Sequence, residues 1–375
     1  MKRNRTLHPR RGLHLLLTAL LLTSCTESSP DDESRRRDPI GENGPDRIDR
    51  TSSDDPNGTI TIAFYNVENL FDTRNDPDVD DDEVTPRGPM KWTEERLERK
   101  MEDLARAVGA IGYGSGPDIL GLCEVENRSV LERFVADFFP GSPYRVIHED
   151  SPDRRGIDVA LLYRPEVVTP VGHRLHAIDL GEGERPTRSL LEVEFRRGIG
   201  GFNVLVNHWP SRSGGESKSR WKRERAAAVL RGVLDSIARV ESGRDVVIIG
   251  DFNDTPLDRS LRVVLGAGPL RNAISSRKSP AINLAWPIAE VDTFGTYLYR
   301  DDWDVLDQII ITPALLDDHG LSLLDSGMTI VAPPFLRDDH PSQPRRPPRR
   351  TFIRRTLYIG GTSDHFPVFA RFAWR

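Results

Sequence analysis

The chain has 375 residues, of which 37% are hydrophobic, and a formal net charge of −6 at pH 7. This length can bury the core of one large domain or two smaller ones. An acidic protein is a poor non-specific binder of long polyanions, because phosphate contacts need lysine and arginine. The sequence contains two cysteines, too few for a fold built on a disulfide framework.

The first segment has the pattern of an export signal. A basic stretch is followed by the apolar run HLLLTALLLTS, which is too short for a comfortable transmembrane span. The sequence Leu22-Thr23-Ser24-Cys25 resembles the lipobox of bacterial lipoproteins, and the alternative is an ordinary signal peptide cleaved nearby. We therefore predict a lipoprotein signal peptide at 1–24, acylation of Cys25, and an exported protein that is lipid-anchored at the bacterial cell envelope. Loss of five basic residues with the signal would bring the formal charge to −11.

Residues 25–58 are rich in Ser, Pro, Asp and Arg and have almost no aliphatic side chains, which predicts a flexible polar tether. From residue 59 to 375 the pattern is that of one globular domain. Alternating or continuous apolar runs predict strands at 59–66, 117–126, 144–149, 157–163, 190–195, 202–208, 245–250, 293–299, 305–312 and 366–374.

Three helices interrupt the series of strands. Thr93 precedes a helix whose apolar stripe includes Leu97, Met101 and Leu104. Asn127 caps a short second helix, and the third covers 218–240. The acidic run at 76–83 lacks the glycine and glutamate spacing of an EF-hand, so we predict a solvated loop there and another irregular loop at 338–350. Many strands with few helices favour an α+β fold.

Seven of the strand-like segments share one unusual property: each ends in a metal-ligand or acid–base side chain. Such groups stay buried only when they are paired or bound to a cation. The pattern therefore predicts that the strands converge on a single polar, metal-binding cleft. The side chains concerned are Asn66, Glu124, Asp158, His208, Asp251 with Asn253, Asp307, and Asp364 with His365.

The motifs FYNVEN, GDFND and SDHFP, with Glu124 after the apolar run PDILGL, resemble the endonuclease/exonuclease/phosphatase superfamily over residues 59–375. The segments FYNVENLFDT, VNHWPSR and LDQIII are similar to its bacterial secreted branch. The resemblance implies a four-layer αββα sandwich in which two mixed β-sheets are flanked by helices, with the active site at one edge of the sheet pair. Without the SDHFP motif, GDFND would read as a strand-ending turn.

The resemblance also implies roles for these residues. Asn66, Glu124 and Asp364 match metal-binding positions, and Mg²⁺ (or Mn²⁺ or Ca²⁺) prefers such oxygen ligands. The matching catalytic positions are His208, Asp251, Asn253, Asp307 and His365. Asp251 would act as the base or orient the attacking water, Asn253 would donate to the phosphoryl oxygen, and Asp307 would hold His365 as an imidazolium. Asp364 could instead position His208 and water.

Several residues have two interpretations. Asp158 is either a site residue or a buried partner of Arg154 or Arg155. Arg212 and Lys218 are candidate phosphate contacts or solvated charges, and Trp303 and Asp304 could line the pocket. By strand alternation we expect Glu126 to point outward and Glu68 not to be a ligand. Cys123 reads as a small buried hydrophobe.

The resulting hypothesis is metal-dependent hydrolysis of phosphate esters, most of all phosphodiesters, by a monomeric enzyme acting on substrates such as DNA or RNA. One alternative is a phosphomonoesterase or phospholipid-headgroup hydrolase of the same fold. The alternative from a different class is a non-catalytic envelope binding protein, whose mark would be degenerate motifs.

Overall fold

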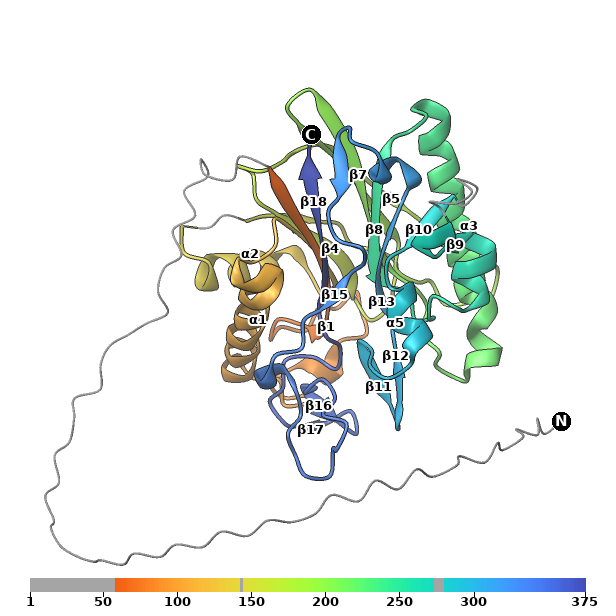
Figure 1. Cartoon of the computed structure of the whole chain (residues 1–375). Coiled ribbons are helices and arrows are strands. Elements are labelled where there is room, and N and C mark those ends of the chain that lie inside the picture. The colour runs from red at the N-terminus through yellow and green to blue at the C-terminus, as the bar shows by residue number, and fades with distance from the viewer. Residues whose placement is uncertain (1–57, 142–143, 273–279) are drawn as a thin grey trace, which may run out of the picture. The chain divides into compact units, whose positions relative to one another are not determined.

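Two β-sheets packed face to face form the centre of the fold (Figure 1). The structure, a computed structural model, describes residues 58–141, 144–272 and 280–375. The predicted signal peptide, Cys25 and the tether up to residue 57 lie outside the described residues. No helix within the described ranges is both long and apolar enough to cross a membrane.

The first sheet has the strand order β14-β18-β1-β2-β4-β3, with β15 paired to β18. Its central strand β1 runs antiparallel to β18 and parallel to β2. The bounds are β1 Thr59–Leu70, β2 Ile119–Val125, β3 Arg145–His148, β4 Asp158–Tyr163, β14 Leu321–Leu323, β15 Thr329–Ile330 and β18 Val368–Trp374.

The second sheet has the order β5-β6-β7-β8-β13-β10-β9. Here β7 is parallel to β8, and β13 is antiparallel to β8. The bounds are β5 Thr169–His176, β6 Leu190–Arg197, β7 Gly200–His208, β8 Asp245–Asp251, β9 Ala267–Gly268, β10 Ala281–Asn283 and β13 Asp307–Ile311.

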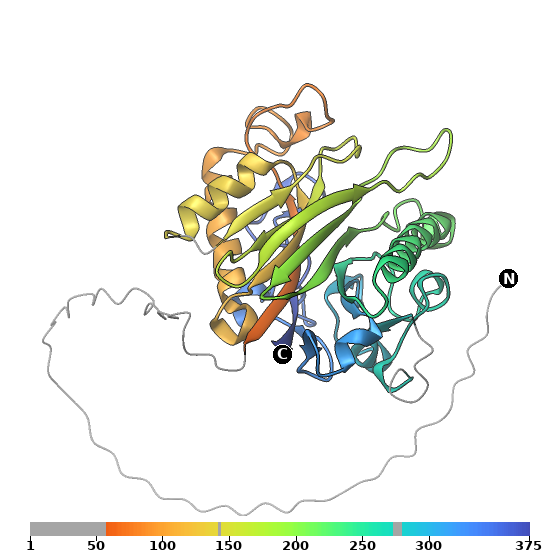
Figure 2. The ribbon, with the colours of Figure 1, turned by 90° about the horizontal axis from the view of Figure 1, so that it is seen from above.

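Helices cover the outer faces of the two sheets, which gives four layers (Figure 2). The helices α1 (Glu94–Gly114) and α2 (Arg128–Phe138) pack on the first sheet, and α3 (Glu216–Val240) packs on the second. A short helix, α5 (Trp286–Val291), follows β10. The fold is thus the predicted α+β four-layer sandwich.

Two small hairpins complete the structure. They are β11 (Tyr297–Tyr299) with β12 (Asp302–Asp304), and β16 (Phe352–Ile353) with β17 (Leu357–Tyr358). Both lie at the lower end of the sheets in Figure 1. The short helical turns are η1 Asp82–Val84, η2 Ser260–Leu265, η3 Pro313–Leu316 and η4 Pro334–Leu336.

The alternation along β1 shows how the sequence specifies the layers. Ile60, Ile62 and Phe64 are fully buried and belong to the core between the sheets. The intervening Ala63 and Tyr65 belong to the core beneath α1 and α2. A strand that is buried on both faces must be apolar on both faces. Full burial of each large apolar side chain contributes about 1.5–3 kcal/mol.

Most predicted elements are present, with shifts at their ends. Thr93 stands at the N-cap position of α1 without a capping hydrogen bond, whereas the Asn127 side chain accepts one from the Val130 amide. The helix α3 begins at Glu216, two residues earlier than predicted. The exposed edge strand β5 was not predicted, because Thr169–His176 lacks an alternating apolar pattern.

The described chain starts and finishes at the same end of the sheets. The Trp374 amide near the end of β18 donates to the Gly58 carbonyl beside the start of β1, at 3.2 Å. β1 runs from there to Asn66 and Leu70 at the opposite end. We call the end near Gly58 and Trp374 the entry end.

Candidate active site

Three adjacent strands of the second sheet bring polar side chains together at the end remote from the entry end. In the register of β7, β8 and β13, Asp251 lies opposite both His208 and Asp307. All three side chains are at least 96% buried, with exposures of 4%, 2% and 0% for His208, Asp251 and Asp307. The apolar strands therefore hold three polar groups in fixed positions on one edge.

The first sheet contributes Asn66 and Glu124 from the parallel strands β1 and β2. The Asn66 Nδ2 donates to Asp251 Oδ2 at 3.1 Å and lies 3.4 Å from Glu124 Oε1. Both strands are irregular here: the pairing shifts after Asn66, and Glu124 has a φ of 62°. Positive φ values are uncommon outside glycine and often mark functional sites. This irregularity turns Glu124 towards the second sheet.

A cavity of about 570 Å³ opens over these residues. It is lined by the predicted site residues Glu124, His208, Arg212, Asp251, Asn253, Asp364 and His365. Asn66 and Asp307 lie just behind the wall, hydrogen-bonded to Asp251 and His365 respectively. The predicted residues, with the exception of Asp158, thus gather around one polar cleft.

His365 is held by Asp307. Its Nδ1 lies 2.7 Å from Asp307 Oδ2, and its Nε2 faces Asp251 Oδ2 at 3.9 Å. Burial acts to lower the pKa of His365, but Asp307 and Asp251 outweigh it and raise the pKa well above its usual value. The two carboxylates therefore favour the protonated, imidazolium form of His365.

The carboxylates of the cleft repel one another. Burial raises the pKa of Asp251 to about 6, with His365 opposing this and Asp307 adding to it. Burial and Asp364 raise the pKa of Glu124. Glu68 behaves in the same way: burial and Asp364 raise its pKa to about 7. Such an excess of negative charge fits a divalent cation.

The pKa of His208 is shifted in the opposite direction to that of His365. Burial, followed by Arg188 and Arg155, lowers the pKa of His208 well below its usual value, so the ring is neutral. Its Nε2 lies 3.7 Å from Asp251 Oδ2 and 3.8 Å from Glu124 Oε1. Its buried Nδ1 has no hydrogen-bond partner among the described residues. A neutral imidazole offers one donor and one acceptor nitrogen.

Asp158 does not line the cleft. Its Oδ1 accepts from the Ser151 amide at 2.9 Å, and its Oδ2 lies 3.5 Å from His148 Nε2. The alternative of a partner in Arg154 or Arg155 is also wrong, because these arginines pair with Asp80 and Asp153. The polar residues of the neighbouring loop and of β3 satisfy Asp158 instead.

The expectation that Glu126 points outward is wrong, whereas the expectation that Glu68 is not a metal ligand stays a prediction. Glu126 is 6% exposed, and its Oε2 accepts from the Asp72 amide at 2.6 Å. Glu68 lines the cleft, where its Oε2 accepts from the Thr351 amide. The irregular backbone at Glu68 (φ 48°) and Glu124 breaks the two-residue period on which the expectation rested.

The loop after β7 supplies Arg212 but not Lys218. Arg212 donates to the Asn253 carbonyl at 2.9 Å and to Asp304 Oδ2 at 3.1 Å, so it braces the cleft wall. Lys218 is exposed and not among the lining residues. Asp304 lines the cleft, whereas Trp303 packs against Phe294 and Phe366.

Asn253 points partly inward. Its Nδ2 donates to the Trp209 carbonyl at 3.0 Å, which occupies one of the two amide hydrogens. Its backbone amide donates to Asp251 Oδ1 at 2.9 Å, and its φ is 51°. The GDFND turn therefore fixes Asp251, and Asn253, which lines the cleft, keeps a second amide hydrogen that is not used in this bond.

Sequence reasoning missed two cationic residues of the cleft. Arg188 is 4% exposed; it donates to Asp153 Oδ2 at 3.0 Å and to the Trp209 carbonyl at 2.7 Å. Arg155 lines the cleft and also pairs with Asp153. Arg155 and Arg188 both lie in loops, where no strand-end pattern marks them. For Arg155 alone, the motif RRGID directly before a strand was a visible signal.

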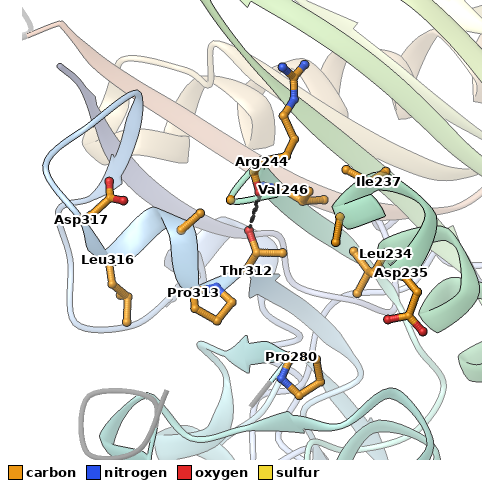
Figure 3. Close-up of a pocket in the computed structure, with 13 residues that line it drawn as sticks. Leu234, Asp235, Ile237, Arg244, Val246, Pro280, Thr312, Pro313, Leu316 and Asp317 are labelled. Carbon is orange, nitrogen blue, oxygen red and sulfur yellow. Dashed lines mark hydrogen bonds between the residues drawn. The ribbon is translucent and has the colours of Figure 1, made fainter. Parts of the chain in front are cut away.

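A second cavity, of about 660 Å³, lies at the entry end of the second sheet (Figure 3). It is lined mostly by apolar side chains, among them Leu234, Val246, Pro313 and Leu316. Among the described residues, the groups of three ligand side chains close enough for a metal lie elsewhere. The larger cavity is thus not the candidate active site.

Comparisons with known proteins agree with this geometry. A sequence model described as the Endonuclease/Exonuclease/phosphatase family matches residues 61–373. A search of curated proteins found no match.

Solved structures share the fold at low sequence identity. A D. rerio TDP2 humanized by 14 mutations has 13% identity and a TM-score of 0.52, covering 84% of this chain and 99% of that one. D. rerio TDP2 complexed with a single-strand DNA product has 14% identity and a TM-score of 0.51, covering 84% and 98%. An endonuclease/exonuclease/phosphatase family protein from Bacteroides thetaiotaomicron has 14% identity and a TM-score of 0.50, with the same coverage. From the family match over nearly all of the described domain, this chain belongs to the endonuclease/exonuclease/phosphatase family and is a phosphoric ester hydrolase.

Proposed function

We propose that this chain hydrolyses phosphodiesters by attack of a water molecule, with the help of a divalent cation. The observation that carries the proposal is the arrangement of Asp251 between the imidazolium of His365 and the neutral ring of His208, opposite Glu124. It supplies a proton acceptor, a cationic donor and a carboxylate ligand within one cleft.

The cation would be held by Glu124 and Asp364, with Asn66 beside them. The donor set is oxygen-rich, as Mg²⁺, Mn²⁺ and Ca²⁺ prefer. The mutual repulsion of Glu124 and Asp364 supports this assignment, since a cation between them would relieve it. When bound, the cation supplies positive charge to the phosphoryl and leaving oxygens.

The protein residues perform the proton chemistry. Asp251 accepts a proton from the attacking water as the bond from the water oxygen to phosphorus forms. His365, oriented by Asp307, and the free hydrogen of Asn253 donate to the phosphoryl oxygen on which charge grows. The bond to the leaving oxygen breaks, and that oxygen takes up a proton from solvent at the cleft mouth.

Two cationic groups favour an anionic substrate with more than one charged position. Arg155 and Arg188 line the cleft, and although both pair with Asp153 they place positive charge beside His208. The D. rerio TDP2 structure with a single-strand DNA product makes a nucleic-acid strand a candidate for this chain too.

The test is turnover of a simple aryl diester. The purified full-length chain should hydrolyse bis(4-nitrophenyl) phosphate with Mg²⁺ or Mn²⁺, and faster than 4-nitrophenyl phosphate. A preference for the monoester would favour the phosphomonoesterase alternative. If diester, monoester and plasmid DNA all remain intact with every divalent metal, the phosphodiesterase proposal fails.

We also propose that the protein is an exported monomer anchored through a lipid on Cys25. The support is the lipobox-like sequence Leu22-Thr23-Ser24-Cys25. Cys25→Ala should release the protein from the membrane fraction of bacterial cells. Continued membrane association of the variant would contradict the anchor.

A further inference from the structure

A cationic segment lies at the cleft end of the sheets. Residues 337–355 contain seven arginines and two aspartates, a local formal charge of +5 in a chain whose net charge is −6. We call residues 337–355 the arginine strap. It leads from η4 into the β16–β17 hairpin, at the same end as β11–β12 (Figure 1).

The strap is fixed to the wall of the cleft. The Thr351 amide donates to Glu68 Oε2 at 2.6 Å, and the buried Lys100 Nζ donates to Thr351 Oγ1 at 2.6 Å. A Cβ on Gly361 would lie 2.0 Å from the Arg349 carbonyl oxygen, so only glycine allows the chain to close here. The strap is therefore held next to Glu68, which lines the cleft.

Several guanidinium groups of the strap are not neutralised. Arg345, Arg346 and Arg354 are exposed, and no carboxylate of the described chain lies within ion-pair distance of them. Burial and the nearby Arg346 lower the pKa of Arg337. Positive groups thus crowd one another on this surface, which favours binding of anions.

Aromatic side chains connect the strap to the cleft. Tyr297 and Tyr299 of β11 line the cleft, and Tyr299 is 55% exposed. The Tyr297 ring lies against the His365 ring, with 4.8 Å between centroids. Burial raises the pKa of Tyr297 to about 12, and Arg350 of the strap acts in the opposite direction at close range.

We propose that the arginine strap binds the phosphates of a single nucleic-acid strand whose scissile phosphate lies in the cleft. This inference rests on the proposed phosphodiesterase function. Arginine binds phosphates, and exposed tyrosines offer faces on which bases stack. Firm membrane binding needs several apolar anchors beside the charges, whereas the strap exposes no large apolar side chain and the adjoining strand β17 exposes Leu357.

The experiment compares two triple variants of the full-length chain. In the strap variant, Arg345, Arg346 and Arg354 are changed to glutamine. In the matched control, the same change is made at Arg145, Arg196 and Arg239, which are exposed and lie at the entry end of β3, β6 and α3. Hydrolysis of a single-stranded 20-mer oligonucleotide and of bis(4-nitrophenyl) phosphate is measured at several NaCl concentrations.

The strap variant should lose about tenfold or more in kcat/KM on the oligonucleotide, chiefly through KM, and show a shallower salt dependence. Both triple variants should match the wild type on bis(4-nitrophenyl) phosphate. Equal losses in the two variants, or none, would overturn the inference. So would a wild type that cleaves the small diester but not the oligonucleotide, which leaves the proposed function intact. If neither substrate is cleaved, the proposed function itself fails.

Sedimentation with phosphatidylglycerol vesicles separates the membrane alternative. We expect the wild type and the strap variant to bind such vesicles equally. Loss of vesicle binding in the strap variant, together with unchanged oligonucleotide turnover, would assign the strap to a membrane surface and refute the nucleic-acid proposal.

Discussion

Two cavities of similar size, about 570 and 660 Å³, lie at opposite ends of β8. β8 begins at Asp245 beside the larger, mostly apolar cavity and ends at Asp251 inside the smaller, polar one. The five residues between Asp245 and Asp251 are all buried and form a continuous core strand. Cavity size therefore says little about chemistry, and the side chains at the strand ends decide it.

Removal of divalent cations should give the largest difference between the polar cleft and the apolar cavity, because only the cleft is proposed to bind a cation. EDTA should reduce hydrolysis of bis(4-nitrophenyl) phosphate to the uncatalysed rate, because the carboxylates of the cleft then repel the substrate. Mg²⁺ at a hundredfold excess over its Kd should raise the free energy of unfolding by about 2.7 kcal/mol, measured by urea denaturation. Full activity in EDTA, with no effect of Mg²⁺ on unfolding, would refute the cation site.

The substitution Asp251→Asn should lower kcat/KM by about 10²–10⁴-fold, because it removes the proton acceptor. The metal-free variant should be at least as stable as the wild type at pH 7, since burial penalises the ionised Asp251 carboxylate. Initial rates and urea denaturation test both points. Asp317→Asn, beside the apolar cavity, is the control and should leave the rates unchanged.

The pH dependence should report the same carboxylate. Asp251 accepts a proton only when ionised, so kcat/KM should rise about tenfold per pH unit below about 6 and then level off. The folded-state pKa lies above the usual 3.8, so protonated Asp251 favours folding. Its contribution to stability should be present below pH 3.8 and lost as the pH rises through about 6. If the metal-free wild type and Asp251→Asn show the same pH dependence of the free energy of unfolding, this prediction is wrong.

At the apolar cavity the expected effect is on stability alone. Leu234 is 6% exposed and packs in the core between α3 and the second sheet. Leu234→Ala should lower the free energy of unfolding by about 2 kcal/mol. The kcat for the aryl diester should stay within about twofold of the wild type. A tenfold loss of kcat with unchanged Mg²⁺ affinity would show that the two ends are coupled.

The smallest effect is expected at Asp158. Asparagine keeps the oxygen that accepts from the Ser151 amide. Asp158→Asn should therefore change kcat/KM by less than about twofold, measured with the aryl diester. A larger loss of kcat/KM would mean that Asp158 acts in the active site after all.

The sequence predicted those parts of the site that come from regular strands. His208 and Asp251 end the apolar strands β7 and β8, and Asp307 begins the antiparallel neighbour β13, so their types and positions at the strand ends were sufficient. The pairing of Asp307 with His365 needed the family resemblance, because 58 residues separate them along the chain. No local pattern carries a contact over such a separation.

The parts that could not be predicted depend on irregular backbone. Glu124 and Glu68 adopt positive φ, which reverses the expected direction of Glu126 and turns Glu68 into the cleft. Arg188 reaches the site from a loop, and its role follows only from its contacts with Asp153 and the Trp209 carbonyl. The strap and the β11 tyrosines become neighbours only through tertiary folding, so no aromatic–basic stripe is visible in the sequence.

The meeting of Gly58 and Trp374 at the entry end has a practical consequence. The described part of the chain starts and finishes there, at the opposite end of β1 from Asn66. A sensor chip or bead coupled to Arg375 would attach the molecule at the entry end. Immobilised in this way, the enzyme would present its cleft and the arginine strap to the flowing solution.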